Sequence, residues 1–420
     1  MKERNTNTLS PQNMVMGFQH MFVMFGATVL VPILTGLDIS VALFASGVGT
    51  LLFHIVTGFK VPVYLGSSFA FIPAIIAIST AEGGSLQQAC GGIMVAGLLY
   101  VVVAIIFKFI TFDTIHKILP PHVTGPMIIL IGLILAPVAI NSANGTNSPS
   151  AVEQIGVAGC WGIAMFTFGF GVFVRIFLAR WGLKFISTLP VLLSLIAGYV
   201  ISIIVGIVNF DPISSADWFG LPPFSLPVFD ISAISIAVPI AIVTMVEHFG
   251  DVLAIGNVVG KDFIREPGIH RTLIGDGLAT SLSAFMGGPA NTTYSENTGA
   301  VALTGNYNPI VMEIAAVFAI VLSVVPKFGG IISTIPVPVV GGISILLFGM
   351  ISSVGIKTMV DNRVDLHEPK ILIISAAMLV LGLGGAEFAL GPIKLSGLGL
   401  AAIIGILLNL ILSIGEDRRR

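Results

Sequence analysis

Long apolar runs follow one another along almost all of this 420-residue chain, and charged residues fall mainly between them. Hydrophobic residues make up 55% and charged residues 10% of the sequence, whereas soluble domains contain roughly 25% charged residues. A helix that crosses a bilayer needs about 20 predominantly apolar residues. The chain is therefore predicted to be an all-α polytopic membrane protein with the lipid bilayer as its surroundings.

Dividing the apolar runs at charged residues and Pro/Gly breaks gives fourteen predicted transmembrane segments. Their centres lie near Phe25, Gly49, Phe71, Ala96, Ile131, Phe166, Ser194, Ile242, Ala279, Gly299, Phe318, Leu346, Met378 and Ile404. Lysine and arginine accumulate on the cytoplasmic side of membrane proteins. With the N-terminus inside, 17 of the 19 basic residues fall on that side, including Lys2, Arg4 and Arg418–Arg420. The pattern predicts that both termini are cytoplasmic.

Composition also excludes several classes of function. The formal net charge of −2 gives no reason to expect a nucleic-acid partner. Cys90 and Cys160 are the only cysteines, which excludes a disulfide framework. No zinc-type Cys/His spacing is present. We therefore expect neither a metal site nor a cofactor.

The chain contains a faint internal repeat. Gln19-His20 matches Glu247-His248 at an offset of 228 residues, and the same offset carries Ser67-Ser68 onto Ser295-Glu296. The matched segments are seven apart in the predicted order, and because seven is odd, the two halves cross the membrane in opposite senses. This arrangement of two inverted 7-segment repeats is typical of secondary transporters, whose substrate site lies near the bilayer midplane.

Segments 3 and 10 each begin with a polar, β-prone stretch, at residues 61–68 and 287–295. Pro, Thr, Tyr and Val disfavour a helix there, so each segment is predicted to break into a short strand plus a half-helix. The two strands can pair with each other. Ser67, Ser68 and Ser295 are suitable N-caps, and the half-helix N-termini would offer N–H donors to a polar ligand.

Three acidic residues lie inside these apolar segments, where such residues normally mark a substrate or ion path. Glu247 and Asp251 are four residues apart on a predicted helix, so both carboxylates point to one face. Two neighbouring carboxylates repel unless one is protonated, which suits a proton-coupled carrier. Glu247, Asp251 and Glu296 are therefore the candidate ligand-binding and proton-coupling residues. The structural alternatives are a local hydrogen bond for Glu247 and a capping role for Glu296.

Four other polar residues in apolar surroundings are expected to have structural roles. His248 lies about 100° round the helix from Glu247, and this position favours a packing hydrogen bond over ligand contact. His20, its repeat partner, is interpreted in the same way. Asp276, flanked by two glycines, is expected to pair with a polar neighbour, and Asn297 belongs to the same structural group.

The stretch Glu296–Gly305 resembles the Glu/Gln-Asn-x-Gly-x-x-x-x-Thr motif of the nucleobase–ascorbate transporters, the second nucleobase–cation symporter family. Residues 19–28, 64–71, 247–250 and 267–271 support this resemblance. It extends from about Gln19 to Ile411 and is close to the bacterial uracil permeases.

The resemblance implies a homodimer in which each subunit has a core domain that moves against a gate domain. The core would comprise residues 13–118 (segments 1–4) and 230–328 (segments 8–11). The gate would comprise residues 119–229 (segments 5–7) and 329–415 (segments 12–14). It also implies that acids at Glu247 and Glu296 hydrogen-bond the N–H groups of a nucleobase, and that backbone groups at Phe69 and Ser295 contact its ring or carbonyls.

The chemistry of uracil fits these residues. Uracil presents two N–H donors to carboxylates and two carbonyls to half-helix N–H groups. Phe69 and Tyr294 would supply flat apolar surface for the ring, and Ser68, at the start of the first half-helix, is a further binding candidate. Glu at the head of the motif resembles the uracil-type members, whereas purine-type members tend to have Gln there.

The chain departs from the family at Asp251, where uracil-type members commonly have His. We predict that this carboxylate carries the coupling proton. The sequence thus predicts a proton–uracil symporter of the cytoplasmic cell membrane, with a xanthine-type purine symporter as the alternative. A channel is less well supported, because it would not need paired broken helices. An enzyme is not expected, because no nucleophile–base or metal set accompanies the acids.

Overall fold

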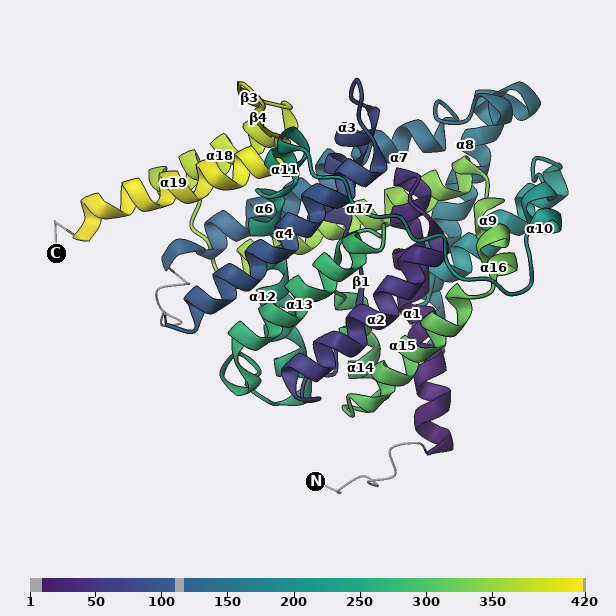
Figure 1. Cartoon of the computed structure of the whole chain (residues 1–420), viewed down its shortest axis with the longest axis horizontal. Helices are drawn as coiled ribbons and strands as arrows, with labels where there is room; N and C mark the ends of the chain where they lie inside the picture. Colours follow the sequence, from purple (N-terminus) through teal and green to yellow (C-terminus); the bar gives the residue numbers. More distant parts are fainter. Residues whose placement is uncertain (1–9, 110–116, 418–420) are drawn as a thin grey trace.

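The computed structural model describes residues 10–109 and 117–417, and this part of the chain is mostly α-helical (Figure 1). Lys2, Arg4 and Arg418–Arg420, which contribute to the predicted cytoplasmic position of the termini, lie outside the described residues.

The first half of the chain contains two groups of elements. The first group is α1 (Pro11–Thr35), α2 (Ile39–Thr57), β1 (Leu65–Ser67), the 3-10 helix η1 (Phe69–Phe71), α3 (Ile72–Thr80) and α4 (Leu86–Phe107). The second group is α6 (Pro121–Ile134), α7 (Ala136–Ala143), α8 (Pro149–Phe173), the π-helical η2 (Val174–Leu178), η3 (Ile186–Thr188), α9 (Pro190–Val205) and α10 (Asp211–Ser215).

The second half begins with α11 (Ile231–Ala237), α12 (Ile240–Val259), η4 (Ile264–Gly268), α13 (Ile269–Phe285), β2 (Asn291–Thr293), α14 (Ser295–Thr304) and α15 (Ile310–Ser323). It ends with α16 (Pro326–Ser333), α17 (Val337–Asp361), α18 (Pro369–Leu383), β3 (Glu387–Leu390), β4 (Ile393–Ser396) and α19 (Gly397–Asp417). The exposed β3–β4 hairpin was not predicted, and it contains Lys394.

Local sequence signals set the ends of several helices. The Ser10 hydroxyl accepts a hydrogen bond from the Asn13 amide at 3.2 Å and caps α1, and the Asp38 carboxylate accepts one from the Val41 amide at 2.9 Å and caps α2. The left-handed residues Gly36 (φ 81°) and Gly58 (φ 66°) end these two helices.

Eight of the described helical stretches are long and apolar enough to cross a membrane, or nine if the bent pair α15–α16 forms one crossing. All fourteen predicted centres fall within described helical elements. Several of these elements are short, however: α3, α9 and α18 have 9, 16 and 15 residues. The described part is therefore a multi-pass helical membrane protein, and helix length accounts for at most nine crossings.

Helices from the two halves of the chain pack against one another. Helix α13 contacts α2 and α4, while α15 contacts α1 and α2. In the remainder of the molecule α17 contacts α6, α7 and α8, and α18 contacts α19 and α6 (Figure 1). Segments that are far apart in sequence thus lie side by side in both regions.

Strands β1 and β2 pair in antiparallel orientation with the register Leu65↔Thr293, Gly66↔Thr292 and Ser67↔Asn291. Two further backbone hydrogen bonds extend the ladder: Ser68 N–H donates to Ala290 O at 2.8 Å, and Tyr294 N–H donates to Tyr64 O at 3.2 Å. Short helices follow each strand directly. The predicted division of segments 3 and 10 into a short strand and a half-helix is confirmed.

Of the three predicted N-caps, only Ser68 occupies a cap position. Ser67 lies within β1, and its hydroxyl donates to Thr28 O at 3.0 Å. Ser68 occupies the cap position of η1 without a side-chain cap bond, and Ser295 is the first residue of α14, behind a cap at Tyr294. Pairing between the strands extends to Ser68 and Tyr294, so the ladder fixes where each helix begins.

Candidate functional site

Helix α12 carries Glu247 and Asp251 and packs against η1, β2 and α14, so it meets both chain breaks. Glu247 and Glu296, on α12 and α14, are both half-buried. Within the described chain, no hydrogen bond or ion pair joins either carboxylate to another side chain. Electrostatic repulsion acts on Glu247 from Asp251 and Glu296. The structure thus brings the three predicted acids together and leaves Glu247 and Glu296 without a side-chain hydrogen bond or ion pair among the described residues.

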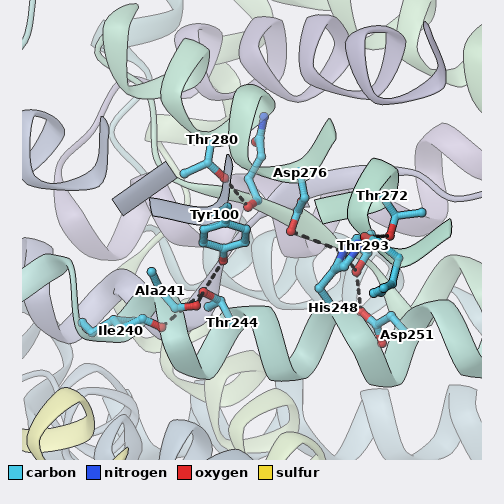
Figure 2. A network of polar contacts seen from close by, with 12 residues as sticks. Tyr100, Ile240, Ala241, Thr244, His248, Asp251, Thr272, Asp276, Thr280 and Thr293 are labelled. Atoms are coloured by element: carbon cyan, nitrogen blue, oxygen red, sulfur yellow. Dashed lines mark hydrogen bonds and ion pairs between the residues drawn. The ribbon is translucent and has the colours of Figure 1, made fainter. Parts of the chain in front are cut away.

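Asp251 has a different environment from the two glutamates. Its side chain is 7% exposed, and Thr293 of β2 donates its hydroxyl hydrogen to Asp251 Oδ2 at 2.8 Å (Figure 2). This bond ties the middle of α12 to the end of the strand that leads into α14. A buried carboxylate that accepts such a bond is stabilised in place.

His248 and Asp276 form the next part of this network. His248 Nδ1 lies 3.3 Å from Asp276 Oδ2 on α13 and 3.4 Å from Thr293 Oγ1, and both side chains are fully buried (Figure 2). Nearby, the Tyr100 hydroxyl donates to Thr244 Oγ1. His248 therefore faces α13 instead of the two glutamates. Asp276 lies within ion-pair distance of His248, but neither of its carboxylate oxygens has a hydrogen-bond partner among the described residues.

Phe69 and Ser68 lie at the start of the first half-helix. The Phe69 ring is 8% exposed and meets the Phe348 ring of α17 edge to face, with the ring centroids 6.1 Å apart. Ser68 is fully buried, and its hydroxyl oxygen has no hydrogen-bond partner among the described residues. A buried hydroxyl in this state can bond to a bound ligand.

Tyr294 is turned toward β1. Its hydroxyl donates to Ser67 O at 2.9 Å, and its ring lies so close to Gly66 that a methyl group there would overlap it. The side chain is only 3% exposed. In this structure Tyr294 therefore braces the two strands, while Phe69 is the aromatic residue next to η1. The backbone of Ser295 begins α14, directly before Glu296.

His20 and Asn297 are both fully buried. Neither ring nitrogen of His20 has a hydrogen-bond partner within the described chain. Asn297 Nδ2 lies 3.7 Å from the sulfur of Met312, and its Oδ1 has no partner among the described residues. These two residues are thus placed in the interior without the complete set of polar contacts that a structural role predicts.

Sequence reasoning missed two contributors to the site. Thr293 lies in the polar stretch before Glu296, but its partner on α12 is 42 residues away. Arg175 lies on η2, and its guanidinium donates to Ser187 O of η3 at 3.4 Å. Helix η3 packs against α14. The interruption of α8 by a π-helix is a feature often found at functional sites.

No cluster of three or more His, Cys, Asp or Glu side chains suited to a metal ion occurs in the described ranges. Two surface grooves lie elsewhere, one lined in part by Ser148 and Pro336, the other by Asp38 and Pro326. Glu247 and Asp251 lie on α12 and Glu296 lies in the first turn of α14, away from both grooves.

Comparison with known proteins gives the family. The sequence model of the Permease family (Xan_ur_permease) matches residues 11–390. The chain belongs to this permease family. Its members are permeases, so the protein is a transporter and not an enzyme, and the resemblance noted in the sequence is confirmed.

Several relatives of this permease share most of its length. It is 42% identical to the probable uracil permease of Pasteurella multocida (strain Pm70), with 98% of this chain and 97% of that one covered. It is 44% identical to the uracil permease of Bacillus caldolyticus and 42% identical to that of Bacillus subtilis (strain 168). Each of these two comparisons covers 96% of this chain and 92% of the relative.

Solved structures of other transporters share the fold of the permease. The transmembrane domain of the cyanobacterial bicarbonate transporter BicA superposes with a TM-score of 0.66 at 15% identity, covering 97% of this chain and 98% of that one. SLC26A9 superposes with a TM-score of 0.70 at 13% identity, covering 96% of this chain and 65% of that one. At these identities the similarity shows the fold alone.

Proposed function

We propose that this permease imports uracil across the cytoplasmic membrane by proton symport. Glu247 and Glu296 carry the proposal: two half-buried carboxylates without a side-chain partner in the described chain, on helices that meet at the β1–β2 ladder. The uracil permeases of two Bacillus species, at 42–44% identity, support uracil as the substrate.

The ligand chemistry follows from the groups that meet at this point. The two glutamates accept hydrogen bonds from the N–H groups of uracil, because ionised carboxylates only accept. Backbone N–H groups at the starts of η1 and α14, near Phe69 and Ser295, donate to its carbonyl oxygens. Phe69 offers an apolar face, the buried Ser68 hydroxyl supplies a further polar contact, and Tyr294 holds the strands behind it.

We assign the coupling proton to Asp251. Glu247 and Glu296 are part of the same proton-coupling group, because the charges of Asp251 and Glu296 act on Glu247. When Asp251 and Glu296 are ionised, their charges repel that of Glu247, and a proton on one of the three relieves this repulsion. Asp251 reaches β2 through Thr293, which places proton binding next to the start of α14. Each positive charge that enters with a neutral base gains about 2.3 kcal/mol per 100 mV of membrane potential.

Transport in this proposal is a movement of a core domain, residues 13–118 and 230–328, against a gate domain, residues 119–229 and 329–415. The packing of α13 and α15 against α1, α2 and α4, and of α17 against α6 to α8, supports two such groups. The Phe69–Phe348 contact and the α14–η3 contact join them. We further propose fourteen segments in two inverted sevens, cytoplasmic termini and a homodimer.

Binding of radiolabelled uracil to the purified full-length protein tests the substrate assignment. Glu247→Gln and Glu296→Gln should each weaken binding roughly tenfold to hundredfold, because hydrogen bonds to charged groups contribute about 1.5–3 kcal/mol. Glu153→Gln, at an exposed position in α8, is the matched control and should bind normally. Normal binding by both site variants, or displacement of uracil by xanthine at lower concentration than by uracil itself, would refute the assignment.

Asp251→Asn tests the proton. In proteoliposomes with an imposed pH gradient, this variant should bind uracil but fail to accumulate it, because the amide cannot carry the coupling proton. Retained gradient-driven accumulation would remove Asp251 from the coupling step and leave it to one of the glutamates.

A further inference from the structure

A second pair of ionisable side chains lies away from the three acids. His54, near the end of α2, is fully buried, and Glu313, in the first turn of α15, has a side chain that is 17% exposed. His54 Nδ1 lies 3.1 Å from Glu313 Oε1. His54 Nε2 lies 2.9 Å from the carbonyl oxygen of Val63, in the extended segment that leads into β1.

These two contacts determine how many protons the pair holds. A carbonyl oxygen only accepts hydrogen bonds, so Nε2 must carry a hydrogen to bond Val63. A contact between Nδ1 and a carboxylate oxygen at 3.1 Å then requires a second hydrogen, either on Nδ1 or on Glu313. The pair is therefore an imidazolium with a carboxylate, or a neutral imidazole with a carboxylic acid. Both forms contain one exchangeable proton beyond the Nε2 hydrogen, and both have zero net charge.

We infer that His54 and Glu313 form a second proton-binding site, separate from Glu247, Asp251 and Glu296, whose proton clamps the segment before β1 between α2 and α15. With the proton bound, His54 bridges Glu313 and the Val63 carbonyl. When the proton leaves, the Nδ1 lone pair faces an ionised carboxylate, and this contact becomes repulsive. Glu313, with part of its side chain exposed, then turns toward water and releases one side of the bridge.

Other ionisable groups lie on the elements that pack against α2 and α15. They are His20 on α1, His270, Arg271 and Asp276 on α13, and Lys327 on α16. Lys60, which follows α2, is paired with Glu266 at 2.6 Å, and Asp276 is paired with His248. Glu313 is the one carboxylate that pairs with the His54 ring in the described part of the chain. The Phe53 ring lies 6.0 Å from the His54 ring and 6.2 Å from the His248 ring, centroid to centroid, and separates the two networks.

The His54–Glu313 pair lies next to the segment that leads into β1, so the clamp affects the candidate substrate site. Val63 is two residues before Leu65, the first residue of β1, and the Leu65 carbonyl is held by the hydroxyls of Ser46 and Thr50 from the same α2 helix. A proton on the pair thus reinforces the placement of the strand that precedes Ser68 and Phe69. The basic-residue pattern predicts a cytoplasmic position for this end of α2, so the clamp responds to the proton concentration inside the cell.

Amide hydrogen exchange of the full-length protein, without uracil, tests the clamp through a peptide spanning residues 59–67. Wild type, Glu313→Gln and Glu313→Ala are compared over a range of pH, after correction for the intrinsic exchange rate at each pH. The Gln carboxamide donates to Nδ1 without an added proton, so Glu313→Gln should stay protected at every pH. Glu313→Ala should exchange roughly tenfold faster at every pH, as expected for loss of one charge-assisted hydrogen bond. Wild type should be protected like Glu313→Gln at low pH and should exchange as fast as Glu313→Ala at high pH.

An identical pH response of wild type and Glu313→Gln would overturn the inference. If Glu313→Ala does not fold, the comparison of wild type with Glu313→Gln decides alone. Glu153→Gln, at an exposed position in α8, serves as the control and should keep the wild-type pH response of this peptide. No outcome depends on uracil, so the proposed substrate can fail without affecting this result.

Discussion

Thr293 donates its hydroxyl hydrogen to Asp251 Oδ2 across 2.8 Å, and this bond links strand β2 to helix α12. Thr293 also pairs with Leu65 in the ladder, and its Oγ1 lies 3.4 Å from His248 Nδ1. A hydroxyl can reverse its hydrogen bond, because it both donates and accepts. When the proton is on Oδ2, Asp251 can donate to Thr293, and the Thr293 hydroxyl can then donate toward His248. The direction of the hydrogen bonds from Asp251 through Thr293 to His248 therefore depends on the proposed coupling proton.

Thr293→Val removes this hydroxyl and keeps the β-branched shape. We expect a loss of about 1–3 kcal/mol in stability, because a buried hydrogen-bond acceptor loses its partner. We also expect a shifted pH profile of uracil uptake. Thermal unfolding and uptake across a pH series measure the two effects. Thr293→Ser keeps the hydroxyl and should retain the wild-type pH profile; equal profiles for the Val and Ser variants would contradict the role of the hydroxyl.

Gly66, at the centre of the ladder, has no room for a side chain. A methyl group there would overlap the Tyr294 ring and lie 2.7 Å from Thr28 Oγ1. Gly66→Ala should therefore destabilise the protein by about 1–3 kcal/mol through overpacking and displace the start of α14. The melting temperature and uracil binding of the purified protein report both effects. Gly169→Ala, on α8 with no atom within 4 Å of the added carbon, should be tolerated, and equal behaviour of the two variants would refute the steric argument.

The broken helices could be predicted because local chemistry decides them. Residues 61–68 and 287–295 both combine Pro, Gly, Ser and Tyr in otherwise apolar segments, and this composition disfavours a continuous helix. The helix starts could not be predicted in the same way. Ser67 and Ser295 are good caps by residue type, but pairing between strands 226 residues apart carries the ladder to Ser68 and Tyr294.

The three acids could be identified from the sequence, because an ionisable side chain in an apolar membrane segment is energetically costly. The residues that contact them could not be identified in this way. Glu247, Asp251 and Glu296 stand out in apolar sequence. Thr293 and Arg175 do not, because a threonine beside a helix break and a basic residue near a helix end are both ordinary. Thr293 contacts Asp251 on α12, and Arg175 contacts η3, which packs against α14; only the folded chain brings these contacts about.

The exposed pair Lys60–Glu266 gives a pH dependence with a definite sign. The hydrogen bond and the charge of Lys60 at 2.6 Å hold the pKa of Glu266 below its ordinary value. A depressed carboxyl pKa in the folded state contributes stability that is present above the unfolded pKa and lost as the pH falls through the folded pKa. The effect is small, because both groups are in water.

Lys60→Gln should therefore flatten the acid side of the melting-temperature profile relative to wild type, and the difference should shrink in high salt. Thermal unfolding of the full-length protein over an acidic pH series measures it. Lys357→Gln removes a basic residue at another exposed position and should leave the acid slope unchanged. Equal slopes for wild type and Lys60→Gln would show that the pair does not contribute.

Tyr294 joins the two chain breaks through its hydroxyl, which donates to Ser67 O at 2.9 Å. Tyr294→Phe keeps the ring against Gly66 and deletes only this bond, so stability should fall by about 0.5–1.5 kcal/mol. Because the bond orients the residue directly before α14, uracil affinity should fall as well, although Tyr294 is only 3% exposed. Tyr307→Phe, at a 42% exposed position, should change neither quantity. Unchanged stability and affinity in Tyr294→Phe would mean that the ladder alone positions α14.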